Sequence, residues 1–205
     1  MLVRIAFTLS VLLGLSTIAF AQNHAYIDQS RSSLRKNMFL TTSVEGEYGR
    51  YQKIAKEGGC IDTESWRGYG IRNGLGVEVM RFTQFSLSHT LLNMRSNDSG
   101  LENLTGSRLS AEIAFSFSAP LTNIQFGLGA MASQLQYQML EKSSSFAGTG
   151  HYYTMGTNYF FSPSISMRTD FKRIVTDNKM TGGSSDYRQL KANTDSLSLG
   201  IAVWL

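Results

Sequence analysis

The sequence predicts an all-β protein, an eight-stranded antiparallel up-and-down β-barrel that spans a membrane. Residues 196–205 alternate apolar side chains with small or polar ones, which is typical of a strand with one face toward lipid. The chain also begins with residues typical of an export signal. Between the two ends, strand-like segments are joined by alternately short and long connections, which is the pattern of a membrane barrel.

The export signal is expected over residues 1–21. Arg4 gives a positive start, residues 5–15 form an apolar run, and Ala19-Phe20-Ala21 fits the small-x-small cleavage rule. This run is shorter than the roughly 20 residues of a membrane-spanning helix, which favours a cleaved signal over an anchor. We expect the mature chain to begin at Gln22, with a periplasmic tail over 22–37 and the barrel over 38–205.

Composition narrows the class of protein further. After the signal, no apolar run is long enough for a spanning helix. With Arg4 removed, 18 basic residues face 15 acidic ones, a formal charge of +3, and these charges are scattered, so no nucleic-acid partner is expected. Cys60 is the only cysteine, so an internal disulfide is excluded. Two prolines in the chain suit a fold made of hydrogen-bonded strands.

The first four expected strands cover 38–50, 66–80, 85–95 and 108–118. Their outward-facing residues are predicted to be Leu40, Thr42, Val44 and Tyr48; then Tyr69, Ile71, Leu75, Val77 and Val79; then Phe85 and Leu87; and then Leu109, Ala111, Ile113, Phe115 and Phe117. In the third strand, Leu91-Leu92 breaks the period of two, which predicts a bulge or a register change.

The last four expected strands cover 122–139, 151–161, 164–174 and 196–205. Outward residues are predicted to be Ile124, Phe126 and Leu128; then Tyr153, Met155, Tyr159 and Phe161; then Ile165, Met167 and Phe171; and finally Leu197, Leu199, Ile201, Val203 and Leu205. In the fifth strand, Leu135, Tyr137 and Met139 fall on the opposite parity. This phase change predicts either a bulge near residues 129–133 or a strand that leaves the membrane there.

The connections and the polar faces together favour a membrane barrel over a soluble sandwich or a lipocalin-like barrel, which also alternate. Short turns are expected at 81–84, 119–121 and 162–163, and long polar loops at 51–64, 96–106, 140–150 and 175–192. The polar faces are rich in Gly, Ser and Ala and carry charges that could pair across a lumen. Aromatic residues collect at strand ends, as in an interfacial girdle: Tyr48, Trp66, Tyr69, Phe82, Phe85, Phe117, Phe160 and Phe161.

The charges with inward parity predict a plugged lumen. Five acids are expected inside, Glu45, Glu47, Glu78, Glu112 and Asp170, against four bases, Arg72, Arg108, Arg168 and Lys172. Eight strands leave an interior just wide enough for side chains, and charges shielded from water must pair. An ion-pair network that fills the lumen is therefore expected, with a proton or ion path along the same residues as the alternative.

The chain resembles the small eight-stranded outer-membrane barrels of the OmpX and OmpA-transmembrane-domain type. The segment 74–82, the alternation over 107–118 and the final strand carry the resemblance, together with the signal. It implies the outer membrane of a Gram-negative bacterium, contact with membrane lipid and lipopolysaccharide, and an assembly signal in the terminal pattern of Leu197, Leu199, Ile201, Val203 and Leu205, read by the barrel-assembly machinery. The chain departs from the family in ending at Leu205, where such barrels end in Phe or Trp.

Three functions remain open at this level. A surface protein would use four extracellular loops for adhesion to a host surface, for an envelope partner or for envelope integrity; the candidate contacts are Lys53, Lys56, Trp66, Lys179, Tyr187 and Arg188. A lipid-modifying enzyme would need a nucleophile and base in contact, and His89 with Glu78 across strands is the weak candidate. A narrow porin-like channel is the third. We expect a non-enzymatic surface barrel with no catalytic residue, cofactor or metal, because no His, Cys, Asp and Glu set has metal-ligand spacing.

Overall fold

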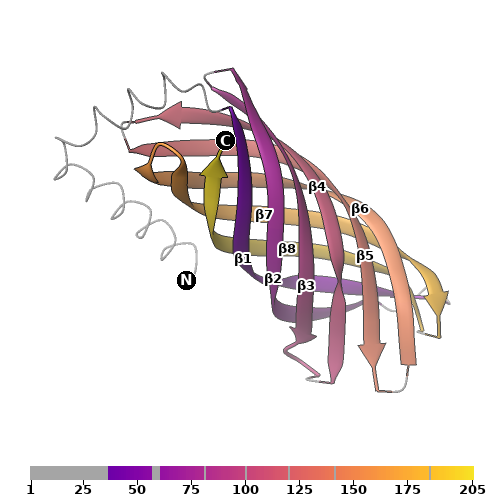
Figure 1. The fold of residues 1–205 in the computed structure, drawn as a ribbon. Coiled ribbons are helices and arrows are strands. Elements are labelled where there is room, and N and C mark those ends of the chain that lie inside the picture. The colour runs from indigo at the N-terminus through magenta and orange to yellow at the C-terminus, as the bar shows by residue number, and fades with distance from the viewer. Residues whose placement is uncertain are drawn as a thin grey trace.

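The computed structural model describes residues 37–56, 61–80, 82–99, 101–119, 121–140, 142–184 and 186–205. The expected signal, almost all of the expected tail and Cys60 lie outside these residues. Eight antiparallel strands form one closed barrel in which each strand pairs with the next and β8 pairs with β1 (Figure 1). The strands are β1 Met38–Ala55, β2 Ile61–Met80, β3 Thr83–Ser96, β4 Glu102–Ser118, β5 Thr122–Met139, β6 Lys142–Ser162, β7 Ile165–Gly183 and β8 Tyr187–Trp204. The predicted fold class is confirmed.

The ladder that closes the barrel is long and regular. It runs from the Phe39–Trp204 pair to the Ile54–Gln189 pair without interruption. β1 begins and β8 ends at the same end of the barrel (Figure 1); we call this the turn end and the opposite end the outer end. Within the described residues, no helix is long and apolar enough to cross a bilayer.

The strands reach much further toward the outer end than expected, so the prediction of four long loops is wrong. The connections there span only residues 56–60, 97–101, 140–141 and 184–186. Most residues assigned to loops, including nearly all of 175–192, pair in the ladder instead. Their outer faces are polar and lack the lipid-facing alternation, so the sequence alone predicts loops there.

An apolar belt surrounds the half of the barrel nearer the turn end. It consists of the outward-facing residues of 38–48, 69–79, 85–91, 109–117, 124–128, 153–161, 165–171 and 197–205, most of which are exposed apolar side chains. At about 3.3 Å per residue and a tilt of about 40°, the 18 residues of β1 rise about 45 Å. A lipid-facing band is about 25 Å tall, so about 20 Å of the barrel continues beyond the belt.

Every strand reverses the side on which its apolar residues lie where the belt ends. In β1 the outward Tyr48 is followed by the inward, buried Tyr51, and in β4 the outward Leu109 is preceded by the inward, buried Leu104. The inward residues just beyond the belt in the other strands are also buried: Trp66, Leu92, Leu135, Phe146, Ile174 and Leu190. The barrel is therefore apolar outside in one half and apolar inside in the other.

This reversal explains the two phase breaks without any bulge. Leu91 faces outward and Leu92 inward, and both pair in register with their neighbours in β2 and β4. β5 pairs continuously through 129–133 on both sides. The predicted bulges are wrong. The phase change in β5 marks the point where the strand leaves the belt, which is the alternative that the sequence left open.

Candidate functional site

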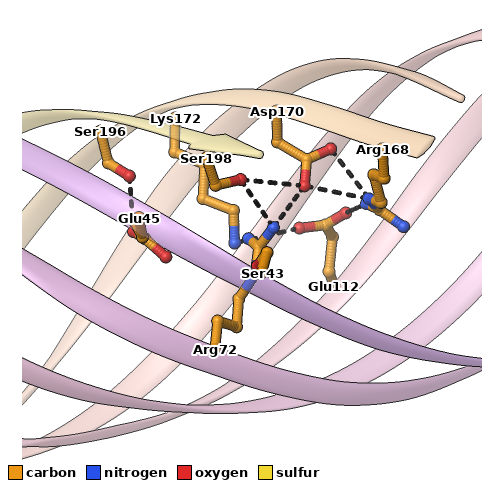
Figure 2. Close-up of polar contacts among 9 residues, drawn as sticks. All are labelled: Ser43, Glu45, Arg72, Glu112, Arg168, Asp170, Lys172, Ser196 and Ser198. Carbon is orange, nitrogen blue, oxygen red and sulfur yellow. Dashed lines mark hydrogen bonds and ion pairs between the residues drawn. The ribbon is translucent and has the colours of Figure 1, made fainter. Parts of the chain in front are cut away.

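The centre of the lumen holds a buried ionic cluster built by alternation on five strands. Glu45 comes from β1, Arg72 from β2, Glu112 from β4, and Arg168, Asp170 and Lys172 from three successive inward positions of β7, with serines of β1 and β8 among them (Figure 2). All six charged side chains are buried. The strand period of two places them inside because the apolar residues between them face the belt.

Asp170 is the hub of this cluster. Arg168 Nε donates to both of its carboxylate oxygens at 2.9 Å, and Arg72 Nη2 donates to Oδ2 (Figure 2). Arg72 is held in turn by Ser43, whose Oγ accepts from Nε at 3.2 Å, and by Ser198, whose Oγ accepts from Nη2 at 2.9 Å. One carboxylate thus compensates two guanidinium groups.

Glu112 and Glu45 complete the central cluster. Glu112 Oε1 lies 3.5 Å from Arg168 Nη2, and its Oε2 lies 3.8 Å from Lys172 Nζ. The Lys172 ammonium also lies 4.4 Å from the centre of the Tyr152 ring. Glu45 accepts a hydrogen bond from Ser196 Oγ at 2.5 Å. These contacts join β4 to β6 and β7 across the lumen, and β1 to its neighbour β8.

A second ion pair lies on the outer side of this cluster. Arg108 Nη1 and Nη2 donate to the two oxygens of Glu47 at 2.5 and 2.9 Å, a bidentate geometry. Arg108 Nη2 also donates to Tyr51 Oη at 3.3 Å. With this pair, four buried acids (Glu45, Glu47, Glu112 and Asp170) meet four buried bases (Arg72, Arg108, Arg168 and Lys172). The interior charge is balanced, as burial without water requires.

The lumen is closed toward the outer end by an apolar core that we call the outer plug. Its buried residues are Tyr51, Trp66, Leu92, Met94, Leu104, Leu135, Tyr137, Phe146, Leu190 and Ala192. Lys53 lies inside it with 0 % exposure, paired with Glu64 at 2.6 Å and with Glu102. Its ammonium also lies 5.3 to 5.8 Å from the ring centres of Trp66, Tyr137 and Tyr187, within cation–π range.

The outer plug shifts the titration of its polar groups. Burial opposes the charge on Lys53, but the hydrogen bonds to Glu102 and Glu64 outweigh this and raise the pKa of Lys53. Burial raises the pKa of Glu102 despite its bond from Lys53, and the neighbouring Glu64 carboxylate adds to the effect. Burial also raises the pKa of Tyr51 and of Tyr137 well above the usual tyrosine value.

A smaller aromatic group closes the turn end. The Trp204 ring lies 4.8 Å from Phe39 and 5.6 Å from Phe160, and all three are buried. Trp204 Nε1 donates to Ser166 Oγ at 3.1 Å. The family's barrels end in Phe or Trp, whereas here the aromatic Trp204 faces inward and packs in the lumen, and Leu205 faces outward.

The structure brings together most of the residues predicted for the lumen. Eight of the nine are buried, and Glu78 has inward parity but is only half-buried, near the turn end. The terminal pattern from Leu197 to Leu205 faces outward, as predicted. Its role as an assembly signal stays a prediction.

The predicted loop contacts divide into two groups. Lys53 and Trp66 are corrected: both are buried in the outer plug and offer no contact surface, because strand pairing continues through the region that was read as a loop. Lys56, Lys179 and Arg188 are exposed, and Tyr187 is half-buried against the outer plug. Phe160 and Trp66 also leave the predicted girdle, since both face inward.

The sequence interpretation missed the outer plug altogether. Tyr51, Leu104 and Phe146 fall in predicted loops, and the parity change at Leu135 in the fifth strand is the one sign of the outer plug in the sequence prediction. His89, the weak catalytic candidate, faces outward on β3 beside Asn73 of β2, and Glu78 faces the other side of the wall. Among the residues that the structure describes, no group of three His, Cys, Asp or Glu side chains could hold a metal ion.

Comparison with known proteins supports the fold. No protein-family model matches the sequence, and no curated protein matches it. Neisserial surface protein A is similar in structure, with a TM-score of 0.53 and 13 % identity over 80 % of this chain and 97 % of that one. The outer-membrane protein OprG from Pseudomonas aeruginosa gives a TM-score of 0.54 and 8 % identity over 82 % and 96 %. The chain has the fold of the small outer-membrane β-barrels.

Proposed function

We propose that this chain is a non-conducting outer-membrane barrel that presents its polar outer half at the cell surface, for contact with a host or envelope partner or for envelope integrity. The apolar belt covers residues 38–48 of β1, which rise about 28 Å at the same spacing and tilt, close to the roughly 25 Å of a lipid-facing band, and its side chains are exposed. The wall beyond the belt is polar outside and packed inside, as a water-exposed structure requires. Because the loops are short, the contact surface is the protruding wall and its tips, including Lys56, Lys179 and Arg188.

The observation that carries this proposal is the closure of the lumen at three levels. The outer plug, the charge-balanced ionic cluster and the Phe39–Phe160–Trp204 group each place buried side chains in the lumen. A channel would need a continuous wet path, and these layers leave buried side chains in its place. A filled interior also makes the wall rigid, which suits a scaffold that holds a binding surface.

Location is tested by fractionation and by the gel mobility of boiled and unboiled protein. An outer-membrane barrel should appear in the outer-membrane fraction and change mobility only after heating, because its closed ladder resists detergent. A cysteine introduced at Lys179 in a Cys60→Ser background should react with a membrane-impermeant maleimide on intact cells. A soluble periplasmic protein without a heat-dependent shift would contradict the proposal.

Conduction is tested in planar bilayers with the refolded protein. We expect no steady conductance from the wild type. The Trp66→Gly/Tyr137→Gly variant, which opens the outer plug, is the informative partner, because the ionic cluster below it should still block ion flow. Steady wild-type conductance that is lost on substitution of Arg72 or Asp170 would instead establish the alternative of an ion path.

The surface role is tested by comparing cells with and without the protein. Binding of host matrix or host cells, and survival in detergent and bile salts, separate adhesion from envelope integrity. Mass spectra of lipid A and phospholipid from the same cells address lipid modification: an acyl gain or loss that depends on the protein would contradict a non-enzymatic role.

A further inference from the structure

Three arginines lie side by side on the outside of the wall, just beyond the apolar belt. Arg50 is on β1, Arg67 on β2 and Arg95 on β3, and all three side chains are exposed and have outward parity. We call them the arginine cluster. Tyr48 and Tyr69, which are 49 % and 64 % exposed, lie next to Arg50 and Arg67 at the edge of the belt nearer the outer end.

The register brings these like charges close together. Arg67 pairs directly with Arg95 across β2 and β3, so their Cβ atoms lie about 5 Å apart. Tyr48 pairs with Arg67, which makes Arg50 a diagonal neighbour of Arg67 at about 7–8 Å. Like charges directly opposite each other on a sheet are destabilising, so this arrangement requires an explanation.

The two acids that the register places beside the cluster, Asp98 and Asp195, bond to Ser65 N and to Arg173 instead. Among the described residues, none of the three arginines takes part in an ion pair. Arg95 Nε donates only to the neutral Asn103 side chain, at 3.2 Å. Arg173, at a similar level on β7, differs: it lies 3.6 Å from Asp195. Within the described part of the chain, the arginine cluster therefore has no ion-pair partner and is open to an anion from outside.

A groove lined by both polar and apolar side chains adjoins the cluster at Arg50. It has a volume of about 880 Å³ and is also lined by His151 of β6 and by Lys191 and Asn193 of β8. Its acid, Asp177, accepts a hydrogen bond from Gln189 at 2.5 Å. The groove has the size and polarity to take sugar hydroxyls beside a bound phosphate.

We propose that the arginine cluster binds the phosphate groups of a phosphorylated glycolipid in the leaflet at the outer end, with its acyl chains on the belt below and its sugars in the groove. Guanidinium forks match phosphate oxygens in bidentate geometry, and one phosphate between Arg67 and Arg95 relieves their repulsion. The height of the cluster is that of lipid headgroups, since tyrosines mark the interface. The inference rests on the proposed membrane location.

The test uses the full mature chain refolded in a zwitterionic detergent, with lipid A as the probe and native mass spectrometry as the readout. The heat-dependent gel shift is measured first on every variant, so that failure to form a barrel is distinguished from failure to bind lipid. The Arg67→Gln/Arg95→Gln variant is compared with Lys179→Gln/Arg188→Gln, which removes the same charge from exposed positions farther from the belt.

We expect the cluster variant to bind lipid A about 30-fold more weakly, because each cation near an anionic lipid surface is worth about fivefold in affinity. The control variant should stay within about twofold, since surface contributions fall off within a Debye length. Equal loss in the two variants, or no loss in either, would overturn the site. Wild-type binding of phosphatidylglycerol as tight as that of lipid A would overturn the glycolipid assignment, and displacement of lipid A by inorganic phosphate would overturn a lipid ligand.

Discussion

The Glu47–Arg108 pair allows the energetics of the closed lumen to be measured. The perturbation is a double-mutant cycle of Glu47→Met, Arg108→Met and both together. The two side chains are only 5 % and 2 % exposed, and their contact is bidentate. Among the described residues, Tyr51 is the only other side chain that hydrogen-bonds to either partner, so the cycle isolates one interaction.

The expected magnitudes follow from burial. Each single substitution leaves one buried charge without its partner, which costs about 3–5 kcal/mol of unfolding free energy. The double substitution removes both charges and leaves two apolar side chains of similar volume beside Tyr51 and the outer plug. It should therefore lie within about 1–2 kcal/mol of the wild type. The implied coupling energy is at least about 4 kcal/mol in favour of the pair.

Urea unfolding in lipid vesicles, followed by tryptophan fluorescence, provides the assay. Both described tryptophans, Trp66 and Trp204, lie inside the barrel and report its opening. Arg173 and Asp195 form the matched control, because they are an ion pair on β7 and β8 with 56 % and 39 % exposed side chains. Their coupling should stay below about 1 kcal/mol. The reasoning is refuted if both Glu47 and Arg108 singles leave stability within about 1 kcal/mol of the wild type, or if the double variant is as unstable as the sum of the singles.

Three further outcomes are expected. Burial raises the pKa of Tyr51 above its ordinary value of 10.0, so above about pH 10 the phenol stays protonated in the folded state but ionises in the unfolded state. The free energy of unfolding should therefore fall as pH rises above about 10. In urea titrations at several pH values, Tyr51→Phe should make this fall less steep. Trp204→Ala removes the ring that packs on Phe39 and Phe160 and should cost about 3–5 kcal/mol, whereas unchanged unfolding would mean that this group does not close the turn end. Gly129→Ala places a Cβ into the Tyr152 ring and should cost about 1–3 kcal/mol, seen as a lower temperature for the gel shift; an unaffected variant would show that Tyr152 has room to move.

The half of the fold within the belt could be predicted because its alternation has one meaning along the whole segment. Leu109 to Phe117 and Leu197 to Leu205 keep one parity, face outward and are exposed, as expected. The same parity predicts which charged residues face inward, so the sequence alone places Asp170 and its partners in the lumen. Which acid pairs with which base depends on barrel tilt and stagger, which alternation does not specify.

The half beyond the belt could not be read in the same way. In β5 the apolar residues face outward up to Leu128 and inward from Leu135 onward. If the apolar face is assumed to point toward lipid along the whole strand, this change of side looks like a local bulge. Lys53 falls within the loop predicted at 51–64, and lysines are almost never fully buried without partners. Glu64 and Glu102, the partners that make its burial possible, are distant in sequence. Only the three-dimensional register reveals such a contact.

The parity reversal marks one height around the barrel, and the face of each strand that tolerates a charged residue differs on the two sides of that height. Within the belt, a lysine in place of the outward Leu109 would face lipid. Five residues away on the same strand, beyond the belt, the inward Leu104 is the position where a charge would be buried. Mutational tolerance should therefore swap faces at one height on all eight strands. A vertical shift of the barrel in the bilayer would expose apolar belt residues to water or place the polar wall in lipid. The sequence therefore determines the depth at which the barrel sits in the membrane.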